Sequence, residues 1–389
     1  MSFGATFFTE FESGAWRQWP EVQRLSRLLD EALSGGGLEP LARQAQAVTR
    51  RYFGRTMRLF APLYLSNECI NNCAYCGFSR DNPILRTTLT PAQVEQEAAF
   101  LAGQGFRSIL LVAGEHPKFV SNGYLEECVR RVLKYAPSVA LEVGPMEQDE
   151  YVPMVRAGAE GLVVYQETYV PKAYAEYHTA GPKKNFGWRL ETPERAYDAG
   201  FRRLGIGALF GLAPWREEAI ALAAHLAFMQ RRCWKAFLTV SFPRLRPAAG
   251  GFQPAHRFSD RELAALVCSL RVVFPQVGIV LSTRENAALR EALLPLGITH
   301  MSAGSHTEPG GYTGVGTDAL HRTVKGRVVA LENAETCKQA TEQFKIADER
   351  SAAEVAEMLR RKGYDPVWKD WDVSLTTAAQ SPGGNGLCV

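Results

Sequence analysis

The chain has 389 residues, of which 46% are hydrophobic and 22% are charged. This composition excludes a disordered or collagen-like chain, and the length fits one large domain or two average ones. The 44 Lys and Arg residues against 41 Asp and Glu residues leave a formal net charge of +3, which favours neither nucleic acid nor a membrane as a partner. No apolar run reaches the ~18 residues of a spanning helix, and the N-terminus does not resemble a signal peptide. We therefore expect a cytoplasmic protein.

The first fifty or so residues are predicted to be helical. Apolar side chains recur near helical spacing over residues 16–33, and this helix should end at the glycines of residues 35–37. A second helix is expected over residues 40–52. Both precede the first strand, so residues 1–57 are interpreted as an N-terminal helical extension that caps the fold. The apolar positions are Val22, Leu25, Leu28, Leu29, Ala32, Leu41, Ala45 and Val48.

After this extension a unit repeats, made of an apolar β-rich run, a loop and a helical pattern. Near-continuous apolar strands that alternate with helices indicate an all-parallel sheet covered by helices. Eight runs favour an α/β fold of the (β/α)8 TIM-barrel type over an open doubly wound sheet, and a six-stranded partial barrel is the alternative. Catalytic residues are then expected where strands end. The runs are residues 60–65, 108–112, 139–143, 161–166, 204–208, 236–241, 277–281 and 298–302.

Several helices of this repeat carry start signals. Thr90 and Thr192 each precede a proline, which predicts an N-cap followed by proline at the first helical position. Ser259 and Glu262 predict a capping box. We assign the barrel to residues 58–304 and a C-terminal cap region to residues 305–380. The cap region begins with a glycine-rich loop and contains a helix at about residues 351–362, and residues 381–389 are expected to form a flexible tail.

Three of the eight cysteines, Cys69, Cys73 and Cys76, form a C-x3-C-x2-C motif directly after the first predicted strand. Clustered thiols in a reducing compartment indicate a metal or redox site. A structural zinc would need a fourth ligand, and the nearest other Cys or His is His116. A disulfide with a spare thiol fits that compartment less well. A [4Fe-4S] cluster with three cysteine ligands leaves one iron open to a small molecule, whereas a cluster for electron transfer normally has four.

The motif, with Tyr75 before its last cysteine and a barrel around it, resembles the radical S-adenosylmethionine (SAM) superfamily. The resemblance implies that SAM binds the open iron and that the reduced cluster cleaves SAM to a 5′-deoxyadenosyl radical. Gly114-Glu115 resembles the element that binds the SAM amino group. Glu167 is expected to bond the ribose hydroxyls, and Arg189 to pair with the SAM carboxylate.

The resemblance adds further cofactor contacts. Gly205 and Gly207 resemble the glycine-containing strand that packs against adenine, where the missing side chain lets a ligand approach the backbone. Tyr75 and Phe78, beside the cysteines, are included in the cofactor site. Plainer interpretations are a solvated loop carboxylate for Glu115 and a helix-end salt bridge for Arg189.

Other segments narrow the resemblance to the aromatic amino-acid lyases of this superfamily. Most are typical of the whole branch, whereas residues 348–351 and 366–372 are most similar to the 2-iminoacetate synthases. The resemblance implies a carbon–carbon lyase that splits L-tyrosine between Cα and Cβ into 2-iminoacetate and p-cresol, for the thiazole ring of thiamine. A tryptophan lyase or other lyase of the branch, and an iron–sulfur electron carrier, are the alternatives. The matching branch segments are residues 61–67, 76–79, 164–169, 180–183, 243–247, 302–305 and 309–312.

The hydrogenase maturase of this branch carries a second cluster site with a C-x2-C pair beyond the barrel. Here only Cys337 and Cys388 follow the barrel, and they are far apart, so we expect no second cluster. Cys128, Cys233 and Cys268 lie in helical patterns and are interpreted as buried small hydrophobes.

Three residues are expected to contact the substrate. Arg284, after the seventh strand, resembles the carboxylate-binding arginine of the branch, and Ser305, after the eighth, adds a hydrogen bond in this interpretation. Tyr64 ends the first strand and is expected to bond the amine or carry a proton, with a barrel-filling aromatic as the alternative.

The remaining expectations concern the rim and the partners. Arg244 and Arg246 are interpreted as rim salt bridges, and His306 stands where the branch has a less conspicuous residue. The implied partners are L-tyrosine, a one-electron donor of the flavodoxin or ferredoxin type, and thiazole synthase.

Overall fold

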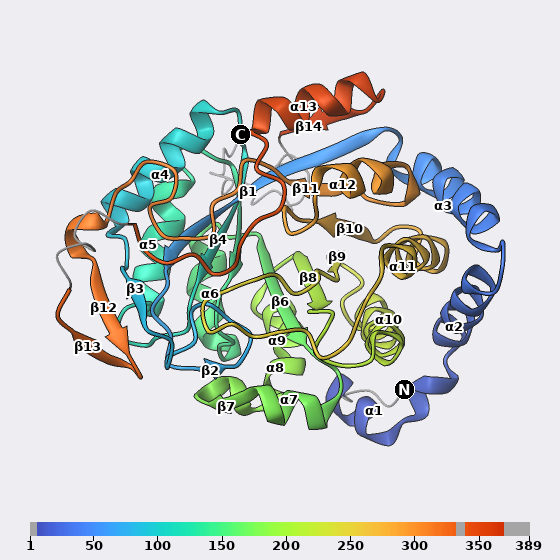
Figure 1. Cartoon of the computed structure of the whole chain (residues 1–389), viewed down its shortest axis with the longest axis horizontal. Coiled ribbons are helices and arrows are strands. Elements are labelled where there is room, and N and C mark those ends of the chain that lie inside the picture. Colours follow the sequence, from blue (N-terminus) through green and yellow to red (C-terminus); the bar gives the residue numbers. More distant parts are fainter. Residues whose placement is uncertain (1–5, 332–338, 369–389) are drawn as a thin grey trace, which may run out of the picture.

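The computed structural model describes residues 6–331 and 339–368 (Figure 1). Its centre is a closed barrel of eight parallel strands, in which the last strand pairs with the first through Arg58 and His300. Every run predicted as a strand is one, and the six-stranded alternative is wrong. In barrel order the strands are β1 (Thr56–Ser66), β4 (Ser108–Ala113), β5 (Ser138–Glu142), β6 (Gly161–Glu167), β8 (Arg203–Ala208), β9 (Phe237–Ser241), β10 (Gly278–Leu281) and β11 (His300–Ser302).

Helices form a ring around the barrel and bury apolar faces against it. Thr90 caps its helix with Gln93 and Ser259 with Glu262, and both predicted start signals are confirmed. Thr192 is different: the cap is Glu191, and the Thr192 hydroxyl donates to the Trp188 carbonyl because a short helix runs directly into this one. The ring consists of α4 (Pro91–Gly103), α5 (Asn122–Val132), α6 (Gln148–Ala157), α9 (Thr192–Ala199), α10 (Trp215–Arg232), α11 (Asp260–Val273) and α12 (Ala287–Leu293).

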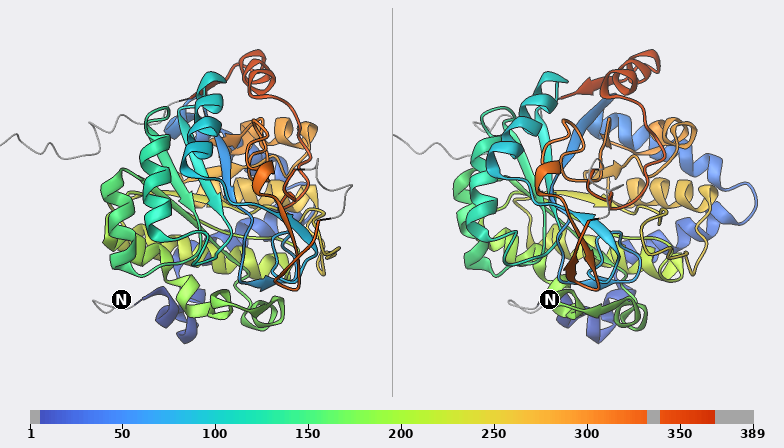
Figure 2. Two further views of the ribbon diagram at one scale, coloured as in Figure 1. Left: turned by 90° about the vertical axis from the view of Figure 1, so that its left-hand side faces the viewer. Right: turned by 60° about the vertical axis from the view of Figure 1, so that its left-hand side comes forward.

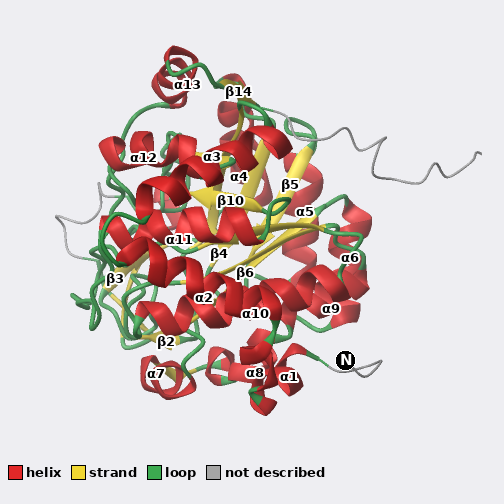
Figure 3. Cartoon of the chain, turned by 90° about the vertical axis from the view of Figure 1, so that its right-hand side faces the viewer, coloured by secondary structure: helices red, strands yellow, loops and turns green. Residues whose placement is uncertain are grey.

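The N-terminal helices lie outside this ring as a partial second layer. The predicted helix over residues 16–33 is two elements, because Pro20 begins a new helix after Trp19. Figure 3 shows α2 against α10 and α11, and α3 against α11. Their buried side chains belong to the same core as the barrel. These elements are α1 (Phe7–Ser13), η1 (Ala15–Gln18), α2 (Pro20–Leu33) and α3 (Leu38–Phe53).

Long loops at the C-terminal end of the barrel carry their own short elements. Two small antiparallel sheets form there, one from β2 and β7 and one from β3, β12 and β13. The loop after β6 folds into two short α-helices, a short strand and a 3-10 helix before α9. These elements are β2 (Asn72–Cys73), β3 (Ile84–Arg86), α7 (Pro171–Tyr177), β7 (His178–Ala180), η2 (Pro182–Lys184), α8 (Phe186–Leu190), η4 (Thr317–Ala319), β12 (His321–Val324) and β13 (Arg327–Val329). A further short helix, η3 (Leu294–Leu296), lies instead in the connection from α12 to β11.

Residues 339–350, here called the mouth segment, cross the open end of the barrel (Figure 2). The segment is fixed by backbone hydrogen bonds of 2.8–2.9 Å to loops that follow four different strands. Its last residues include Asp348, which forms a buried ion pair with Arg290 of α12. The backbone pairs are Thr341 with Leu85, Gln343 with Thr307, Lys345 with Pro247, and Ala347 with Thr283.

The described chain ends with α13 (Ala352–Arg361) and β14 (Asp365–Val367), which pairs with the start of β1. The predicted helix over residues 351–362 is confirmed. Within residues 6–331 and 339–368, no helix is long and apolar enough to cross a membrane. The expected tail at residues 381–389 and the cysteines Cys337 and Cys388 lie outside the described residues.

Candidate active site

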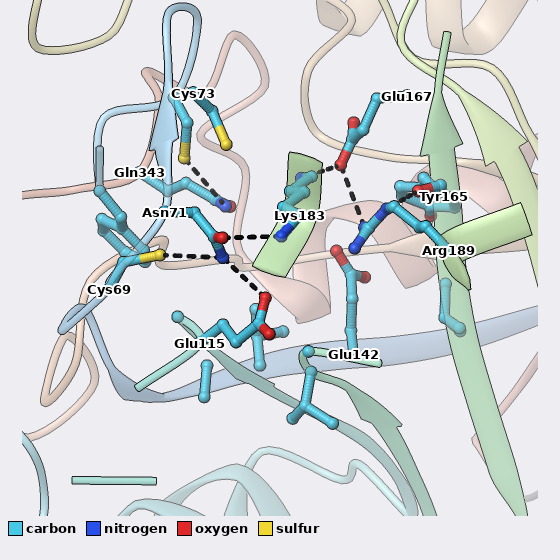
Figure 4. Close-up of a pocket in the computed structure, with 18 residues that line it drawn as sticks. Cys69, Asn71, Cys73, Glu115, Glu142, Tyr165, Glu167, Lys183, Arg189 and Gln343 are labelled. Carbon is cyan, nitrogen blue, oxygen red and sulfur yellow. Dashed lines mark hydrogen bonds and ion pairs between the residues drawn. The ribbon is translucent and has the colours of Figure 1, made fainter. Parts of the chain in front are cut away.

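Loops that follow the barrel strands enclose a cavity, here called the cysteine cavity (Figure 4). The three cysteines of the motif line it, and all three are free thiols. Amide groups approach two of the sulfurs: Asn71 Nδ2 lies 3.8 Å from Cys69 Sγ, and Gln343 Nε2 lies 3.9 Å from Cys76 Sγ. Cys73 is buried. The structure thus gathers three thiols around one space, with N–H donors of the kind that tune iron–sulfur clusters.

This donor set suits a cluster better than a single ion. No three His, Cys, Asp or Glu side chains in the described ranges are close enough together to hold one metal ion, so the thiols surround a larger space. Among the described residues that line the cavity there is no fourth Cys or His. A [4Fe-4S] cluster with three protein ligands and one open iron fits this arrangement.

The opposite wall of the cysteine cavity holds a buried charge cluster. Lys183 Nζ lies 2.6 Å and Arg189 Nη2 3.3 Å from Glu167 Oε1. Burial alone would raise the pKa of the Glu167 carboxyl, but the two cations hold it below its usual value. Glu167 ends β6 with a φ of +72°, a strained conformation outside glycine. Strain of this kind is concentrated at functional sites, and here it aims the carboxylate at the two cations.

Glu115 lies between the cysteines and this charge cluster. Asn71 Nδ2 donates to Glu115 Oε2 at 2.6 Å, so one amide contacts both the carboxylate and the cysteine loop. Two glycines make the approach possible. A Cβ on Gly144 would lie 2.5 Å from Glu115 Cγ, and one on Gly114 would lie 2.2 Å from the Glu68 carbonyl oxygen. Glu115, Glu167 and Arg189 therefore share one cavity with the cysteines.

The two aromatic residues predicted beside the cysteines, Tyr75 and Phe78, lie in different places. Tyr75 is behind the cavity, where its hydroxyl lies 2.8 Å from His178 Nε2. Phe78 lines the cavity and packs edge-on against Tyr64, with ring centroids 5.9 Å apart. Burial raises the pKa of the Tyr75 hydroxyl well above 10 and lowers that of His178 to about 3, so both are neutral. Tyr75 supports the cysteine loop rather than facing the cavity.

The glycines of β8 lie deeper in the barrel. A Cβ on Gly205 would be 2.9 Å from Val163 Cγ2, and one on Gly207 would be 2.2 Å from the Ser241 carbonyl oxygen. Both strands beside β8 therefore approach it closely. Val163, beside Gly205, also lines the cysteine cavity, whereas the two glycines do not. The adenine contact expected at Gly205 and Gly207 therefore stays a prediction.

A second cavity adjoins the first and contains the three predicted substrate residues, Tyr64, Arg284 and Ser305. We call it the arginine cavity. The Arg284 guanidinium lies 3.3 Å from the centroid of the Phe344 ring and has no carboxylate partner among the described residues. Ser305 Oγ is buried without a hydrogen-bond partner. The Tyr64 hydroxyl donates to Gln343 Oε1 at 2.8 Å. An unpaired arginine and an unpaired hydroxyl in one cavity are donors of the kind that a carboxylate accepts from.

Sequence reasoning missed four residues of these walls. Glu142, at the end of β5, lines both cavities, and its pKa is raised to about 7, mainly by burial and then by the charge of Glu167. Its signal was present, because a glutamate stood inside an apolar run at a strand end. Lys183 and Asn71 lie in loops near the cysteines. Gln343 had no local signal, because its position depends on the mouth segment.

The rim residues are not part of either cavity wall. Arg244 pairs with Glu285 and Asp260, which confirms the predicted rim salt bridge, whereas Arg246 Nε is buried without a partner. His306 is 2.9 Å from Glu308. Elsewhere, the helical cysteines are buried as predicted: Cys128, Cys233 and Cys268.

Comparison with known families agrees with this geometry. Residues 63–226 match the Radical SAM superfamily, and residues 241–365 match the Biotin and Thiamin Synthesis associated domain. The first match spans the cysteine loop, Glu115, Glu167 and Arg189. The second includes Arg284 and Ser305. The barrel, the three-cysteine loop and these matches define the chain as a radical SAM enzyme.

Individual relatives show which family of radical SAM enzymes the chain resembles. The 2-iminoacetate synthase of Escherichia coli (strain K12) is 41% identical over 354 residues, 91% of this chain and 88% of that protein. That of Salmonella typhimurium (strain LT2) is 40% identical over 345 residues, 88% of this chain and 86% of that protein. The solved FeFe-hydrogenase maturase HydG from Carboxydothermus hydrogenoformans has a TM-score of 0.77 and 34% identity, covering 92% of this chain and 80% of that chain. The chain belongs to the 2-iminoacetate synthase family.

Proposed function

We propose that this protein cleaves the Cα–Cβ bond of L-tyrosine to 2-iminoacetate and p-cresol, with a [4Fe-4S] cluster and SAM as cofactors. SAM is converted to methionine and 5′-deoxyadenosine. The observation that carries the proposal is the pair of adjoining cavities, one lined by three thiols and the other by an unpaired arginine and an unpaired serine hydroxyl. An iron–sulfur electron carrier needs no substrate cavity, so the second cavity favours an enzyme over that alternative.

The cysteine cavity supplies the cofactor contacts in this proposal. Cys69, Cys73 and Cys76 would hold the cluster, and Glu115, Glu167 and Arg189 offer bonds to the polar groups of SAM. When bound and reduced, the cluster and SAM would supply the radical chemistry that removes a hydrogen atom from the substrate amine. Glu167 and Arg189 already neutralise each other in part, so the cavity accepts the zwitterionic end of SAM without an unpaired buried charge.

The arginine cavity would hold the amino acid. Arg284 and Ser305 bind the carboxylate, because a guanidinium fork and a free hydroxyl both donate to it. Tyr64 closes the wall toward Phe78 and the cysteines. The substrate backbone is thereby held beside the cysteine cavity. Holding the reacting groups together makes the step effectively unimolecular.

The mouth segment gives the reaction its dry surroundings. Gln343 and Phe344 line the arginine cavity, and Gln343 also lines the cysteine cavity, so the same stretch covers both. Excluding water protects a reactive radical from side reactions. The one-electron donor, flavodoxin or ferredoxin, thiazole synthase as receiver of 2-iminoacetate, and a cytoplasmic location complete the proposal.

The first experiment is anaerobic product analysis. The protein is reconstituted with iron and sulfide, mixed with dithionite, SAM and L-tyrosine, and its products are measured by mass spectrometry. We expect 5′-deoxyadenosine, p-cresol and glyoxylate, the hydrolysis product of 2-iminoacetate. All three should disappear in Cys76→Ala, which removes a cluster ligand.

Two results would overturn parts of this proposal. 5′-Deoxyadenosine without p-cresol would contradict the tyrosine assignment, and L-tryptophan with its product 3-methylindole-2-carboxylate would be tested next. No 5′-deoxyadenosine from protein with a spectroscopically intact cluster would contradict the radical SAM chemistry itself.

A further inference from the structure

The carboxylate of Glu142 stands where the two cavities meet. Glu142 is the last residue of β5 and lines the cysteine cavity and the arginine cavity, as do Tyr165 and Gln343. Among the described residues, the Glu142 side chain has no hydrogen bond and no ion pair, whereas the carboxylates of Glu115 and Glu167 are both bonded. The Glu142 side chain is half-buried, and Figure 4 shows its carboxylate pointing into the cysteine cavity.

The position of the substrate carboxylate fixes where the amine must lie. The carboxylate and the ammonium of an amino acid are attached to the same carbon, so they lie within a few ångströms of each other. If Arg284 and Ser305 hold the carboxylate, the amine that must meet the radical points toward the cysteine cavity. That direction leads to the junction of the two cavities, and the junction carries an unpaired carboxylate.

We infer that Glu142 binds the α-ammonium group of the amino-acid substrate and accepts one proton from it, which leaves the neutral amine for hydrogen-atom abstraction. The inference rests on the proposed function. The step moves a single proton from nitrogen to a carboxylate oxygen: one N–H bond breaks, one O–H bond forms, and no electron is transferred. Glu142 is thereby a catalytic residue in contact with substrate.

The charges around Glu142 suit this task. Arg284, Arg189 and Lys183 act on it as cations, whereas Glu167 repels it, and Tyr64 and Tyr165 line the same cavity. Burial and Glu167 raise the pKa of the Glu142 carboxyl to about 7. A carboxyl that titrates near neutrality holds a proton at far less cost than an ordinary glutamate. Lys183 and Arg189 are engaged by Glu167, so neither is a competing partner for Glu142.

The test compares two ligands that differ in the amine alone. L-Tyrosine and 3-(4-hydroxyphenyl)propanoate share the phenol and the carboxylate. Their dissociation constants are measured by calorimetry on the oxidised, cluster-loaded protein with SAM, which binds but does not turn over. In Glu142→Gln we expect L-tyrosine to bind at least tenfold more weakly, with 3-(4-hydroxyphenyl)propanoate changed less than twofold. Glu142→Asp should restore part of the affinity for L-tyrosine.

The pH dependence of binding gives a second readout. Glu142 is neutral below its pKa, so the affinity of the wild-type protein for L-tyrosine should fall as the pH drops through about 7. The affinity of Glu142→Gln should be nearly independent of pH over this range. The cluster absorbance and SAM affinity of the variant serve as folding controls and should match those of the wild type.

Three outcomes would overturn the inference. The first is an equal loss of affinity for L-tyrosine and 3-(4-hydroxyphenyl)propanoate in Glu142→Gln, and the second is an unchanged affinity for L-tyrosine. The third is a loss of affinity for SAM, which would mean that Glu142 contacts the cofactor instead. The product analysis of the wild-type protein is independent of these measurements. Failure of that analysis would contradict the proposed function, whereas failure of the binding comparison with p-cresol still formed would contradict only the role of Glu142.

Discussion

At the scale of single residues, the site separates buried charges that are paired from those that are not. Glu167, Lys183 and Arg189 satisfy one another, and Asn71 satisfies Glu115. Arg284, Ser305 Oγ and Glu142 have no such partner among the described residues. Because an unpaired polar group inside a protein is costly, groups left unpaired around a cavity indicate where a ligand completes the bonding.

Arg284 gives the first prediction at this scale. Replacing Arg284 with Gln should weaken L-tyrosine binding by about 2–5 kcal/mol, because one partner of a buried charge pair is lost. Ser305→Ala should cost less, about 0.5–3 kcal/mol, because it removes one hydrogen bond. Both are measured by calorimetry on the oxidised, cluster-loaded protein. Tyramine, which lacks the carboxylate, is the control ligand, and a comparable loss of tyramine binding would contradict the assignment.

At the scale of elements, the strands and the mouth segment play different parts. The parallel strands carry Tyr64, Glu142 and Glu167 to one end of the barrel, as this architecture requires. The mouth segment has neither helix nor strand over residues 339–350. It is held by hydrogen bonds to loops, so its position depends on close backbone contacts.

Gly77 allows the prediction for this element. A Cβ on Gly77 would lie 2.4 Å from the Gln343 carbonyl oxygen and 2.8 Å from that of Glu342. Gly77→Ala should therefore displace the mouth segment, increase its amide hydrogen exchange and weaken L-tyrosine binding. Gly103→Ala is the matched control, because nothing lies within 4 Å of its Cβ. Exchange of residues 339–350 is measured by mass spectrometry, and equal exchange in the two variants would contradict the prediction.

The same two elements show what the sequence could and could not predict. The barrel strands are visible in the sequence because both faces of the sheet are covered, so each strand contains a mostly apolar run. The cysteine loop was visible because its three ligands are local. Gln343 and Phe344 were not, because contacts with residues far away in the chain place them. The sequence does not single out Glu142, because its neighbours Leu141 and Val143 make residues 139–143 resemble the interior of a strand.

At the scale of the whole molecule, the barrel and the N-terminal helices share one hydrophobic core. Leu25 and Leu29 of α2 are fully buried, and they belong to the core that includes α10 and α11. The buried faces of α10 and α11 are apolar, so they depend on this cover. The N-terminal layer therefore stabilises the barrel without contributing a residue to either cavity.

Leu29 tests whether the N-terminal layer stabilises the fold without shaping the two cavities. Leu29→Ala should lower the free energy of unfolding by about 2–5 kcal/mol, because it leaves a cavity between α2 and the ring. Arg27→Ala, on the exposed side of the same helix, should change it by less than about 0.5 kcal/mol. Urea unfolding followed by circular dichroism measures both. An L-tyrosine affinity that falls in Leu29→Ala while the protein is still folded would show that the layer also shapes the site.

The mouth segment also bears on how the enzyme is made. The chain leaves the ribosome with its N-terminus first. All eight strands and the cysteine loop therefore emerge before residues 339–350. Gln343, which contacts both Cys76 and Tyr64, is thus among the last parts of the site to be synthesised. Until it arrives, the cysteine cavity lacks the wall that Gln343 forms, so the three thiols are more open in the nascent chain than in the finished fold.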